Sequence, residues 1–521
     1  MTAGLDSALE MSETEALPEG WTTASLLVVS ALIRGVSYKP EQLGDSSDEG
    51  VVALLRANNI SGAGLTFDNL QHVQNDCVSE IQYLQPGDAV VAMSSGSKSV
   101  VGKAASFFGE WRGTFGAFCG VLRPTPEIDS RYFGLYLQTA SYRSFISERS
   151  AGVNINNLKR QYFDELQIPV PPLAEQRRIA ERVEAVLVRV TATRERLDRS
   201  TVLLTRFRQS VLAAACSGRL TADWRESNGD ETTGAELAEG LRDIHSATGR
   251  TFGGKAASPT EGVHDLKVES FPPTWGMVEL QLLCALDRPI TYGILKPGPD
   301  QAPDGVFYVR VADFPGNRLN VHDLKSTTPA IAYEYRRAAL KPGDLLLSIR
   351  GSVGRVCAVP AELEGANITQ DTARISVNEL ASSRYVLLTL LGPSAQNRLE
   401  RAMKGVAVRG VNIGDVRALQ IPVPGPSEQL EIVRRVDALF ALADSIGDRI
   451  AATVADVTRL SQGILAMAFR GELVQTEAEI ARREGRIYES GEQLLTRIKA
   501  ERSAAPVSTR ARAQSASTGS S

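Results

Sequence analysis

The sequence of 521 residues predicts an α+β protein made by internal tandem duplication, with two β-rich blocks that are each followed by a long helix. Two repeats carry this prediction. IPVPPLAEQRRIAERVEAVLVRV starts at Ile168 and returns as IPVPGPSEQLEIVRRVDALFALA at Ile421, an offset of 421 − 168 = 253. LPEGW ends at Trp21 and is answered by FPPTW, which ends at Trp275, an offset of 275 − 21 = 254. Offsets of this size indicate duplication of whole domains, because solenoid repeats are much shorter.

The two long helices are predicted to pack against each other as a rod. Each follows an extended, proline-rich segment, since proline disfavours the helical conformation at the residue before it. The apolar residues then recur at alternating spacings of four and three, which is the heptad pattern of a coiled coil. Two separate amphipathic core helices are the alternative, but the same long register in both copies favours pairing. Gly218 and Gly471 are expected to end the helices.

Each block preceding a helix contains short β-rich runs broken by turns, followed by a helical stretch. The linker contains one candidate short helix, Glu236–His245, and the C-terminal stretch is charged and helical before it becomes rich in Ser, Ala, Thr and Arg. The expected organisation is a flexible tail (1–16), the first block (17–171), the first helix (172–222), a linker (223–270), the second block (271–424), the second helix (425–474), and a charged helix with a disordered tail (475–521).

Composition disfavours several classes of protein. The five cysteines lie far apart, without CxxC pairs and beside only four histidines, so neither a zinc site nor a disulfide framework is expected. The sequence has no apolar run near the roughly 20 residues needed to span a bilayer, and no secretory signal, so a cytoplasmic protein is expected. The net charge of −4 hides two basic regions. Residues 84–160 carry nine Lys/Arg against five Asp/Glu, and residues 336–417 carry twelve against seven.

Motifs that would indicate catalysis are missing or incomplete. GSKSVVGKA at Gly96–Ala104 superficially resembles a phosphate-binding loop, but five residues separate its glycines where the motif needs four. Its counterpart RGSVGR at Arg350–Arg355 keeps only glycine, serine and basic residues. An exposed glycine hairpin with cations suits contact with phosphates of a nucleic-acid backbone. We find no methyltransferase loop, metalloprotease motif, nucleophile elbow or nuclease carboxylate cluster, so a chain without catalytic residues or a metal site is expected.

The polar residues that stand out are those that recognise bases and phosphates, because Arg, Asn and Gln form paired hydrogen bonds with base edges in the major groove. Capping of turns and helices is the alternative role for the asparagines. The repeat pairs Arg34 with Arg288, Tyr38 with Tyr292, and Arg56 with Arg310, all at an offset of 254. The candidate DNA-binding residues are Arg34, Tyr38, Arg56, Asn58, Asn59, Ser97, Lys98, Lys103, Asn154, Asn156, Asn157, Lys159, Arg288, Tyr292, Arg310, Arg350, Ser352, Arg355, Arg409 and Asn412.

Two variable blocks, each followed by an IPVP segment, a PLAEQ or PSEQ turn and a long helix, resemble the specificity subunit of type I restriction–modification systems. LIRGVSY, LLRANNI, AMSSGSKSVVGK, FGAFCGVLRP and SAGVNINNLK are particularly similar to members of this family. The resemblance extends from residue 17 to about residue 474. It implies that 17–171 and 271–424 are target-recognition domains, each reading half of a bipartite site in double-stranded DNA. It also implies that the helices form an antiparallel coiled coil that separates these domains.

The resemblance further implies partners: two modification subunits that methylate adenine with S-adenosylmethionine, and restriction subunits that translocate and cut DNA with ATP. S-adenosylmethionine, ATP and Mg would bind those partners and not this chain. A stand-alone DNA-modifying enzyme and a coiled-coil adaptor without DNA binding are the alternatives. We expect partner docking on apolar helix residues outside the heptad seam, with contact to the chain's own domains as the alternative. These residues are Leu187, Leu203, Leu212, Phe440, Leu442 and Phe469.

Overall fold

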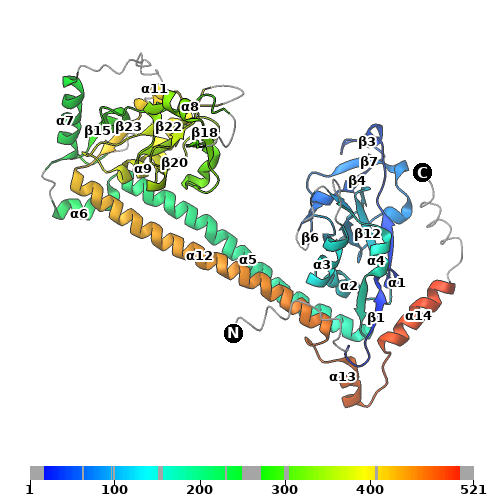
Figure 1. Ribbon diagram of the computed structural model, residues 1–521. Coiled ribbons are helices and arrows are strands. Elements are labelled where there is room, and N and C mark those ends of the chain that lie inside the picture. The colour runs from blue at the N-terminus through cyan, green and yellow to red at the C-terminus, as the bar shows by residue number, and fades with distance from the viewer. Residues whose placement is uncertain are drawn as a thin grey trace. The chain divides into compact units, whose positions relative to one another are not determined.

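The computed structural model describes residues 17–61, 64–95, 97, 100–150, 156–228, 232–248, 271–298, 304–404 and 409–504 (Figure 1). These residues form two compact units. The first unit combines the chain up to residue 197 with the chain from residue 452, and the second unit is 198–451. The helices α5 (Leu173–Cys216) and α12 (Pro426–Arg470) therefore contribute one part to each unit. No helix among the described residues is long and apolar enough to cross a membrane.

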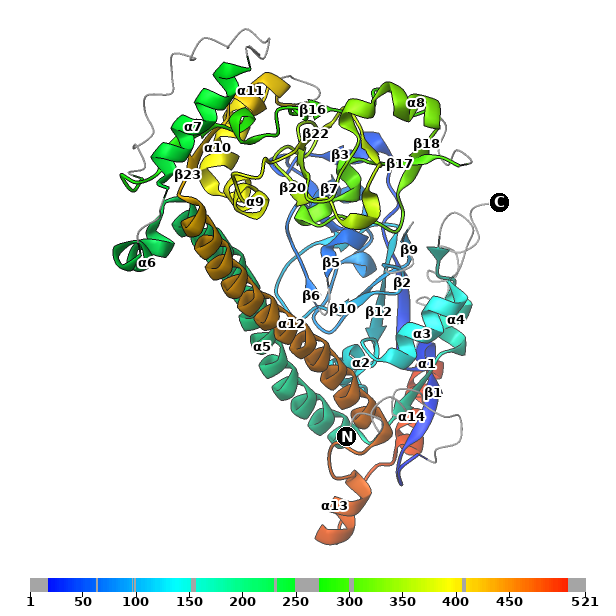
Figure 2. The same ribbon diagram turned by 60° about the vertical axis from the view of Figure 1, so that its left-hand side comes forward.

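The two long helices lie side by side and antiparallel, as Figures 1 and 2 both show. In the first unit the beginning of α5 packs with the end of α12, where Ile179 and Ala468 share one apolar core. In the second unit the end of α5 packs with the beginning of α12, where Val211 and Val436 share another. The predicted antiparallel pairing of the long helices is confirmed.

The first unit is built around two four-stranded sheets. One sheet is antiparallel, in the order β10-β8-β12-β2, and the other has the order β11-β4-β7-β3. The strands of these sheets are β10 (Ala104–Ser106), β8 (Ala89–Ala92), β12 (Cys119–Pro124), β2 (Ser30–Arg34), β11 (Thr114–Phe115), β4 (Val51–Leu55), β7 (Gln71–Gln74) and β3 (Leu43–Gly44). Three strand pairs complete the unit: β1 (Thr22–Ser25) with β14 (Gln167–Val170), β9 (Ser94–Ser95) with β13 (Asn156–Asn157), and β5 (Ile60–Ser61) with β6 (Gly64–Leu65).

The second unit repeats this plan. A sheet in the order β16-β22-β19-β20 is accompanied by a sheet in the order β18-β17-β21 and by the pair β15–β23. The strands are β16 (Thr291–Tyr292), β22 (Thr372–Ile375), β19 (Leu345–Ser348), β20 (Val356–Ala358), β18 (Lys325–Thr327), β17 (Val306–Val309), β21 (Asn367–Ile368), β15 (Gly276–Glu279) and β23 (Gln420–Val423). Its helices are α6 (Ala222–Ser227), α7 (Gly234–Ala247), α8 (Pro329–Glu334), α9 (Ser383–Leu391), α10 (Pro393–Ala402) and α11 (Ile413–Arg417).

The helices that follow the rod segments are also equivalent. The remaining helices of the first unit are α1 (Leu26–Val29), α2 (Ser130–Tyr136), α3 (Ala140–Arg149), α4 (Arg160–Glu165), α13 (Glu477–Glu484) and α14 (Gly491–Ala504). A Cβ atom on Gly491 of α14 would lie 2.1 Å from the carbonyl oxygen of Val170. A Cβ atom on Gly234 of α7 would lie 1.9 Å from that of Val423. Each helix therefore starts with a glycine because its backbone presses against the strand that leads into a rod helix.

The structure corrects the register of the repeat near the first strands. Val36 N donates to Phe115 O and Ile294 N donates to Ile368 O, both at 2.7 Å. The preceding residues, Gly35 and Gly293, are equivalent, since a Cβ atom on either would lie 2.0 Å or less from a backbone oxygen. This offset is 293 − 35 = 258, so Arg34 corresponds to Tyr292. The sequence pairing of Arg34 with Arg288, and of Tyr38 with Tyr292, is wrong because the second copy is four residues longer between Trp275 and Gly293 than the first copy is between Trp21 and Gly35.

The predicted docking residues differ in exposure. Leu203 and Leu442 are 61% and 55% exposed, in agreement with the prediction. Leu212 and Phe469 are buried, so the expectation of exposure is wrong for both. The ring of Phe469 packs at an angle against two tyrosine rings of α2, which is the alternative that the sequence left open. The two remaining residues, which are partly buried against the cores, are Leu187 and Phe440.

Candidate nucleic-acid interface

In the first unit, four backbone segments meet at one edge, which we call the first edge and define by Arg34, Ser94, Phe118 and Asn157. The turn between β11 and β12 presents the carbonyl of Phe118, which accepts hydrogen bonds from Met93 N at 2.8 Å and Ser94 N at 3.2 Å. Ser94 lies opposite Asn157 in the β9–β13 pair, and Arg34 ends β2. The side chains of Arg34, Phe118 and Asn157 are exposed, so this edge offers donors, acceptors and an aromatic ring to a ligand.

The second unit builds the same arrangement, the second edge, from Tyr292, Arg350, Asp371 and Arg409. The carbonyl of Asp371 accepts hydrogen bonds from Ile349 N at 2.8 Å and Arg350 N at 3.4 Å. Arg350 forms a β-bridge with Gly410, as Ser94 pairs with Asn157 in the first unit. The guanidinium of Arg350 lies 4.0 Å from the carboxylate of Asp371 and 3.4 Å from the side-chain oxygen of Gln370. The second edge is therefore charged.

Arg56 and Arg310 precede equivalent 3-10 helices, Ala57–Asn59 and Val311–Asp313, but their side chains are held differently. The guanidinium of Arg310 binds both carboxylate oxygens of Asp313, at 2.6 and 3.0 Å. The Nη2 of Arg56 donates to Asn69 O at 3.1 Å, and its Nε has no hydrogen-bond partner among the described residues. The guanidinium of Arg56 is thus less committed to the protein than that of Arg310.

Two predicted base-contacting residues are engaged inside the fold. The buried Asn59 accepts from Arg56 N at 2.9 Å and donates to Asp68 O at 3.0 Å, which is the capping role considered as its alternative. Arg288 binds Asp344 at 2.5 Å and donates to Ser376 at 3.0 Å.

An ion pair equivalent to that of Arg288 occurs in the first unit, where Arg123 binds Asp88 at 2.7 Å. Asp88 and Asp344 occupy the same place in the LQPGD and LKPGD turns. Arg374 lies next to the second of these pairs, and burial lowers its pKa to about 10. These interactions hold the sheets together rather than form part of an edge.

The glycine hairpins place Lys103 and Arg355 at equivalent positions. Ala92 N donates to Lys103 O, and Ser348 N donates to Arg355 O, both at 2.9 Å. The preceding glycines, Gly102 and Gly354, have φ of +76° and +90°, which other residues rarely adopt. A basic residue therefore follows each tight turn, as phosphate contact would need.

The other predicted residues fall into three groups. The side chains of Asn58, Ser97, Lys159, Ser352 and Asn412 are exposed. Tyr38 is partly buried and donates its hydroxyl to Gln71 at 2.8 Å. The residues that lie outside the described part of the chain, wholly or by their side chain, are Lys98, Asn154 and Asn156.

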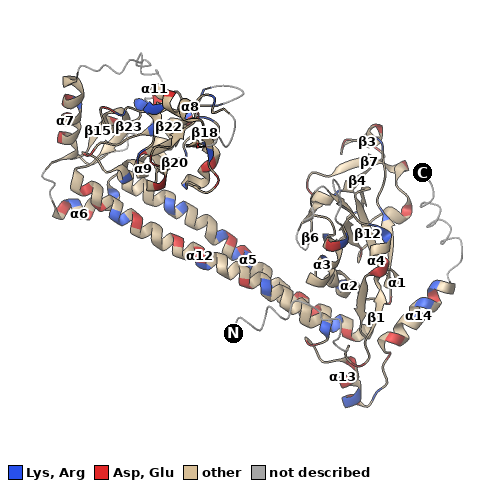
Figure 3. Cartoon of the chain, in the orientation of Figure 1, with Lys and Arg blue, Asp and Glu red and all other residues tan. Residues whose placement is uncertain are grey.

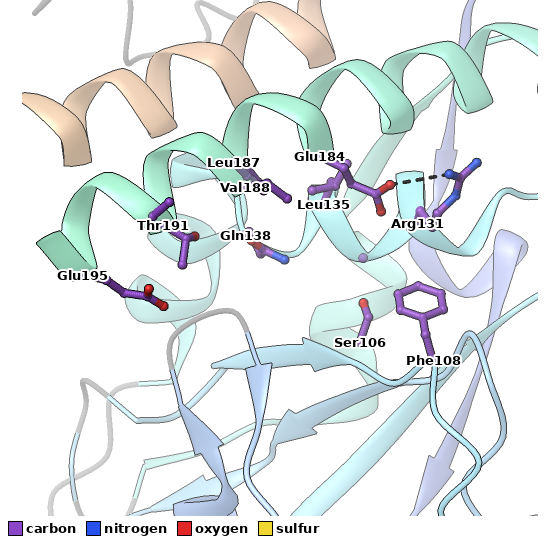
Figure 4. Close-up of a pocket in the computed structure, with 12 residues that line it drawn as sticks. Ser106, Phe108, Arg131, Leu135, Gln138, Glu184, Leu187, Val188, Thr191 and Glu195 are labelled. Atoms are coloured by element: carbon purple, nitrogen blue, oxygen red, sulfur yellow. Dashed lines mark hydrogen bonds and ion pairs between the residues drawn. The ribbon is translucent and has the colours of Figure 1, made fainter.

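A cavity of about 520 Å³ lies in the first unit between α2, the segment after β10, and α5 (Figure 4). Arg131 and Glu184 line it and form an ion pair at 3.4 Å. Burial raises the pKa of the Glu184 carboxyl, against the opposing effect of Arg131. Most of the wall is apolar, and no residue of the first edge lines the cavity. The described residues also contain no cluster of His, Cys, Asp and Glu suited to a metal ion.

Acidic and basic residues are intermixed along both rod helices (Figure 3). Sequence reasoning found most of the polar residues at the two edges but missed Ser94, Phe118 and Asp371. The signal for Phe118 was an aromatic residue in the short turn FGAFCG, where such a side chain is hard to bury.

Comparison with known proteins finds similarity in both copies of the repeat. A family model for the type I restriction modification DNA specificity domain matches residues 46–199 and 303–454. The type I restriction enzyme EcoKI specificity subunit of Escherichia coli (strain K12) is 34% identical over 499 residues, covering 94% of this chain and 97% of that protein. The StySPI specificity subunit of Salmonella potsdam is 35% identical over 503 residues, covering 93% and 96%.

Similarity to a solved structure supports the fold and nothing beyond the fold. It is described as "Structural basis underlying complex assembly and conformational transition of the type I R-M system", and one of its chains matches with a TM-score of 0.55 at 17% identity. The match covers 88% of this chain and 100% of that chain. Both segments matched by the family model belong to corresponding parts of the repeat, since their starts differ by 303 − 46 = 257 residues and their ends by 454 − 199 = 255.

Proposed function

The chain belongs to the family of type I restriction modification DNA specificity domains, and from that premise we propose that it selects the DNA site of a type I restriction–modification complex. Residues 17–171 and 271–424 would each read one half of a bipartite site. The observation that carries this proposal is the repeated edge, in which the same backbone arrangement presents different exposed side chains. A duplicated frame with two side-chain sets is suited to reading two unlike half-sites.

The polar residues of the edges divide by the kind of contact they suit. Exposed residues such as Arg34, Asn157 and Arg350 suit hydrogen bonding to base edges, where sequence is read. Lys103 and Arg355, behind the glycine turns, suit phosphate contacts that position the domain without reading sequence. The paired helices α5 and α12 would set the distance between the half-sites.

Selection of DNA from a random library tests this function. The full chain is mixed with random-sequence duplexes at low salt, and bound DNA is recovered and sequenced. We expect enrichment of two short motifs at a fixed spacing, with binding that weakens steeply as salt rises because phosphate contacts release counterions. DNA binding without any enriched motif, or no binding at all, contradicts the proposal. Methylated adenines within the same motif, in cells that also contain the modification subunits, provide an independent test.

The partners would be two modification subunits and the restriction subunits, which would bind S-adenosylmethionine, ATP and Mg themselves. We propose that exposed apolar residues of the second unit, Leu203 and Leu442, contact a modification subunit. The double variant Leu203→Glu/Leu442→Glu should then lose that subunit on co-purification while its melting temperature stays unchanged. Ile487→Glu is the matched control, because Ile487 is 97% exposed and lies in the first unit. Retention of a stoichiometric complex by the double variant excludes this contact.

A further inference from the structure

The two edges differ most sharply at the turn that presents Phe118 in the first unit and Asp371 in the second. We propose that this position contacts a base in each half-site: Phe118 packs on a thymine methyl group, and Asp371 accepts a hydrogen bond from the amino group of a cytosine. The proposal rests on the function proposed above, and it names two residues that determine specificity.

Phe118 is exposed, and the backbone of its turn is held by hydrogen bonds. Its side chain is 69% exposed. A single exposed apolar residue is ordinary and indicates little by itself. The backbone supplies the second observation, since the Phe118 carbonyl accepts from both Met93 N and Ser94 N, and Cys119 N donates to Gly116 O at 2.8 Å. These bonds fix the backbone of the turn, and with it the direction in which the Cα–Cβ bond of Phe118 points.

The neighbours of Phe118 have the polarity that a thymine contact requires. Arg34 lies opposite Gly120 in the β2–β12 pair, and Asn157 lies opposite Ser94 in the β9–β13 pair. In the major groove, thymine presents its methyl group beside the O4 acceptor, and its adenine partner presents both an acceptor and a donor. An aromatic ring flanked by hydrogen-bonding side chains matches this combination. A ring surrounded by other apolar side chains would suggest a protein partner instead.

Asp371 is the structural equivalent of Phe118, because its carbonyl accepts from Ile349 N and Arg350 N in the same way. Its side chain is 43% exposed, and the neighbouring Arg350 is 50% exposed. The guanidinium of Arg350, 4.0 Å away, offsets repulsion between the Asp371 carboxylate and DNA phosphates, and the half-exposed carboxylate oxygens can still accept a hydrogen bond from a base. Cytosine N4 is the base donor that suits an aspartate acceptor in the major groove. The acceptor oxygens of Asp371 therefore favour cytosine in the second half-site.

Thymine methyl groups can be removed one at a time, which gives a direct test. The full chain is titrated with duplexes carrying its selected motif, in which each thymine in turn is replaced by deoxyuridine. For the wild-type chain we expect about fourfold weaker binding at one thymine of the first half-site, equivalent to about 0.8 kcal/mol for one buried methyl group. Phe118→Ala should bind both duplexes equally, and Phe118→Leu should retain part of the difference.

Asp371→Asn tests the second unit in the same assay. The preference for cytosine at one position of the second half-site should fall roughly fivefold, as for the loss of one hydrogen bond worth about 1 kcal/mol. The preferences in the first half-site should stay unchanged, which makes each variant the control for the other. Phe118 is exposed and the Asp371 side chain is 43% exposed, and both lie on turns, so unchanged melting temperatures are expected for all three variants.

The possible outcomes separate the two levels of the proposal. A wild-type chain that selects no motif overturns the proposed function together with this inference. A wild-type chain that selects a bipartite motif but binds every deoxyuridine duplex equally overturns only the role of Phe118. Equal weakening of all sequences by Phe118→Ala also overturns it, because that result indicates an unspecific contact. An unchanged motif for Asp371→Asn overturns the role of Asp371.

Discussion

The two units share a backbone frame but differ in the chemistry of their edges. Ser94 and Phe118 of the first edge correspond to Arg350 and Asp371 of the second, although the backbone hydrogen bonds at these positions are the same. The first edge is thus mainly neutral, with an aromatic ring, and the second is charged. This comparison shows that the fold depends on backbone contacts, so the exposed side chains are free to differ and to read different DNA.

The buried anchors show the opposite pattern, because their side chains are the same in both units. Trp21 Nε1 donates to Glu175 at 2.9 Å in the first unit, and Trp275 Nε1 donates to Glu428 at 2.8 Å in the second. Each pair joins the start of a globular block to the start of a rod helix. The two anchors differ in the other groups that donate hydrogen bonds to the carboxylate.

The largest effect is expected from dividing the chain, because a fragment lacks parts that the first unit needs. The first unit needs α14 over the β1–β14 pair and the end of α12 against α5, and neither is present in a fragment of residues 1–225. Such a fragment exposes two apolar faces, and we expect it to aggregate. A fragment of residues 1–248 also contains α7, the equivalent of α14. In a twofold dimer, α7 of each copy could cover the β1–β14 pair of its partner.

Analytical ultracentrifugation of the two fragments checks this expectation. The longer fragment should sediment as a folded dimer, and the shorter one as large, polydisperse species. With modification subunits, the dimer should recognise a palindrome made of the first half-site twice. A soluble monomer of residues 1–225 would show that α14 and the end of α12 are dispensable for the first recognition block, and it would contradict the expected need for a covering helix.

The next largest effect is expected from the two anchors. Glu428 accepts from Trp275, from Thr221 at 2.7 Å and from Arg225 at 2.9 Å, so Glu428→Ala leaves a partly buried cation without its partner. We expect a loss of about 3 kcal/mol in the free energy of unfolding. Glu175 accepts from Trp21 and from Glu477 N, and Glu175→Ala should cost less, about 2 kcal/mol.

The contribution of Glu175 to stability should also depend on pH. Burial raises the pKa of Glu175 above its ordinary value of 4.5. Its protonated form therefore stabilises the fold below that value, and this stabilisation is lost as pH rises through the raised pKa. The difference in unfolding free energy between the wild-type protein and Glu175→Ala should be larger at pH 4 than at pH 7. Urea unfolding checks both anchors, with the exposed Glu239→Ala as control, and equal losses for the two substitutions would contradict the predicted order.

How far the sequence predicted this molecule depends on the kind of signal. The long helices and their pairing follow from a heptad pattern that persists over many turns, which makes it a strong local signal. The register error at Arg34 arose because four additional residues between Trp275 and Gly293 shift the offset, and only the close backbone approach at Gly35 and Gly293 reveals the equivalence. Burial of Phe469 against α2 depends on tertiary packing, which no heptad pattern contains.

Only part of the two edges was predicted from the sequence, and the reason is again that a local signal does not contain tertiary contacts. A composition search for base-reading residues finds Arg and Asn, and it found Arg34, Asn157 and Arg350. The same search cannot tell an exposed arginine from one that binds a carboxylate distant in sequence, as Arg288 binds Asp344. It also passes over phenylalanine and aspartate, because most aromatic residues are buried and most acidic residues avoid DNA.

A direct comparison of the two units concerns Arg56 and Arg310, whose substitution should affect DNA selection and not folding. Arg56→Ala should relax selection at one position of the first half-site by about 1–3 kcal/mol if its guanidinium pairs with a guanine. Arg310→Ala should change selection less, because Asp313 already binds the guanidinium and neutralises its charge. Repeated selection from random DNA with each variant measures both effects, and a uniform loss of affinity on all sequences would reassign Arg56 to phosphate contact.

The difference between these arginines can be reversed by one substitution. Asn59 occupies the position of Asp313 in the first unit and accepts a hydrogen bond from the same backbone N–H without a charge. Asp313→Asn should therefore keep the 3-10 helix and free the guanidinium of Arg310. In that background, Arg310→Ala should have a larger effect on selection than in the wild-type chain, approaching that of Arg56→Ala. If the effect of Arg310→Ala is the same in both backgrounds, then the ion pair with Asp313 does not explain why the two units would use this position differently.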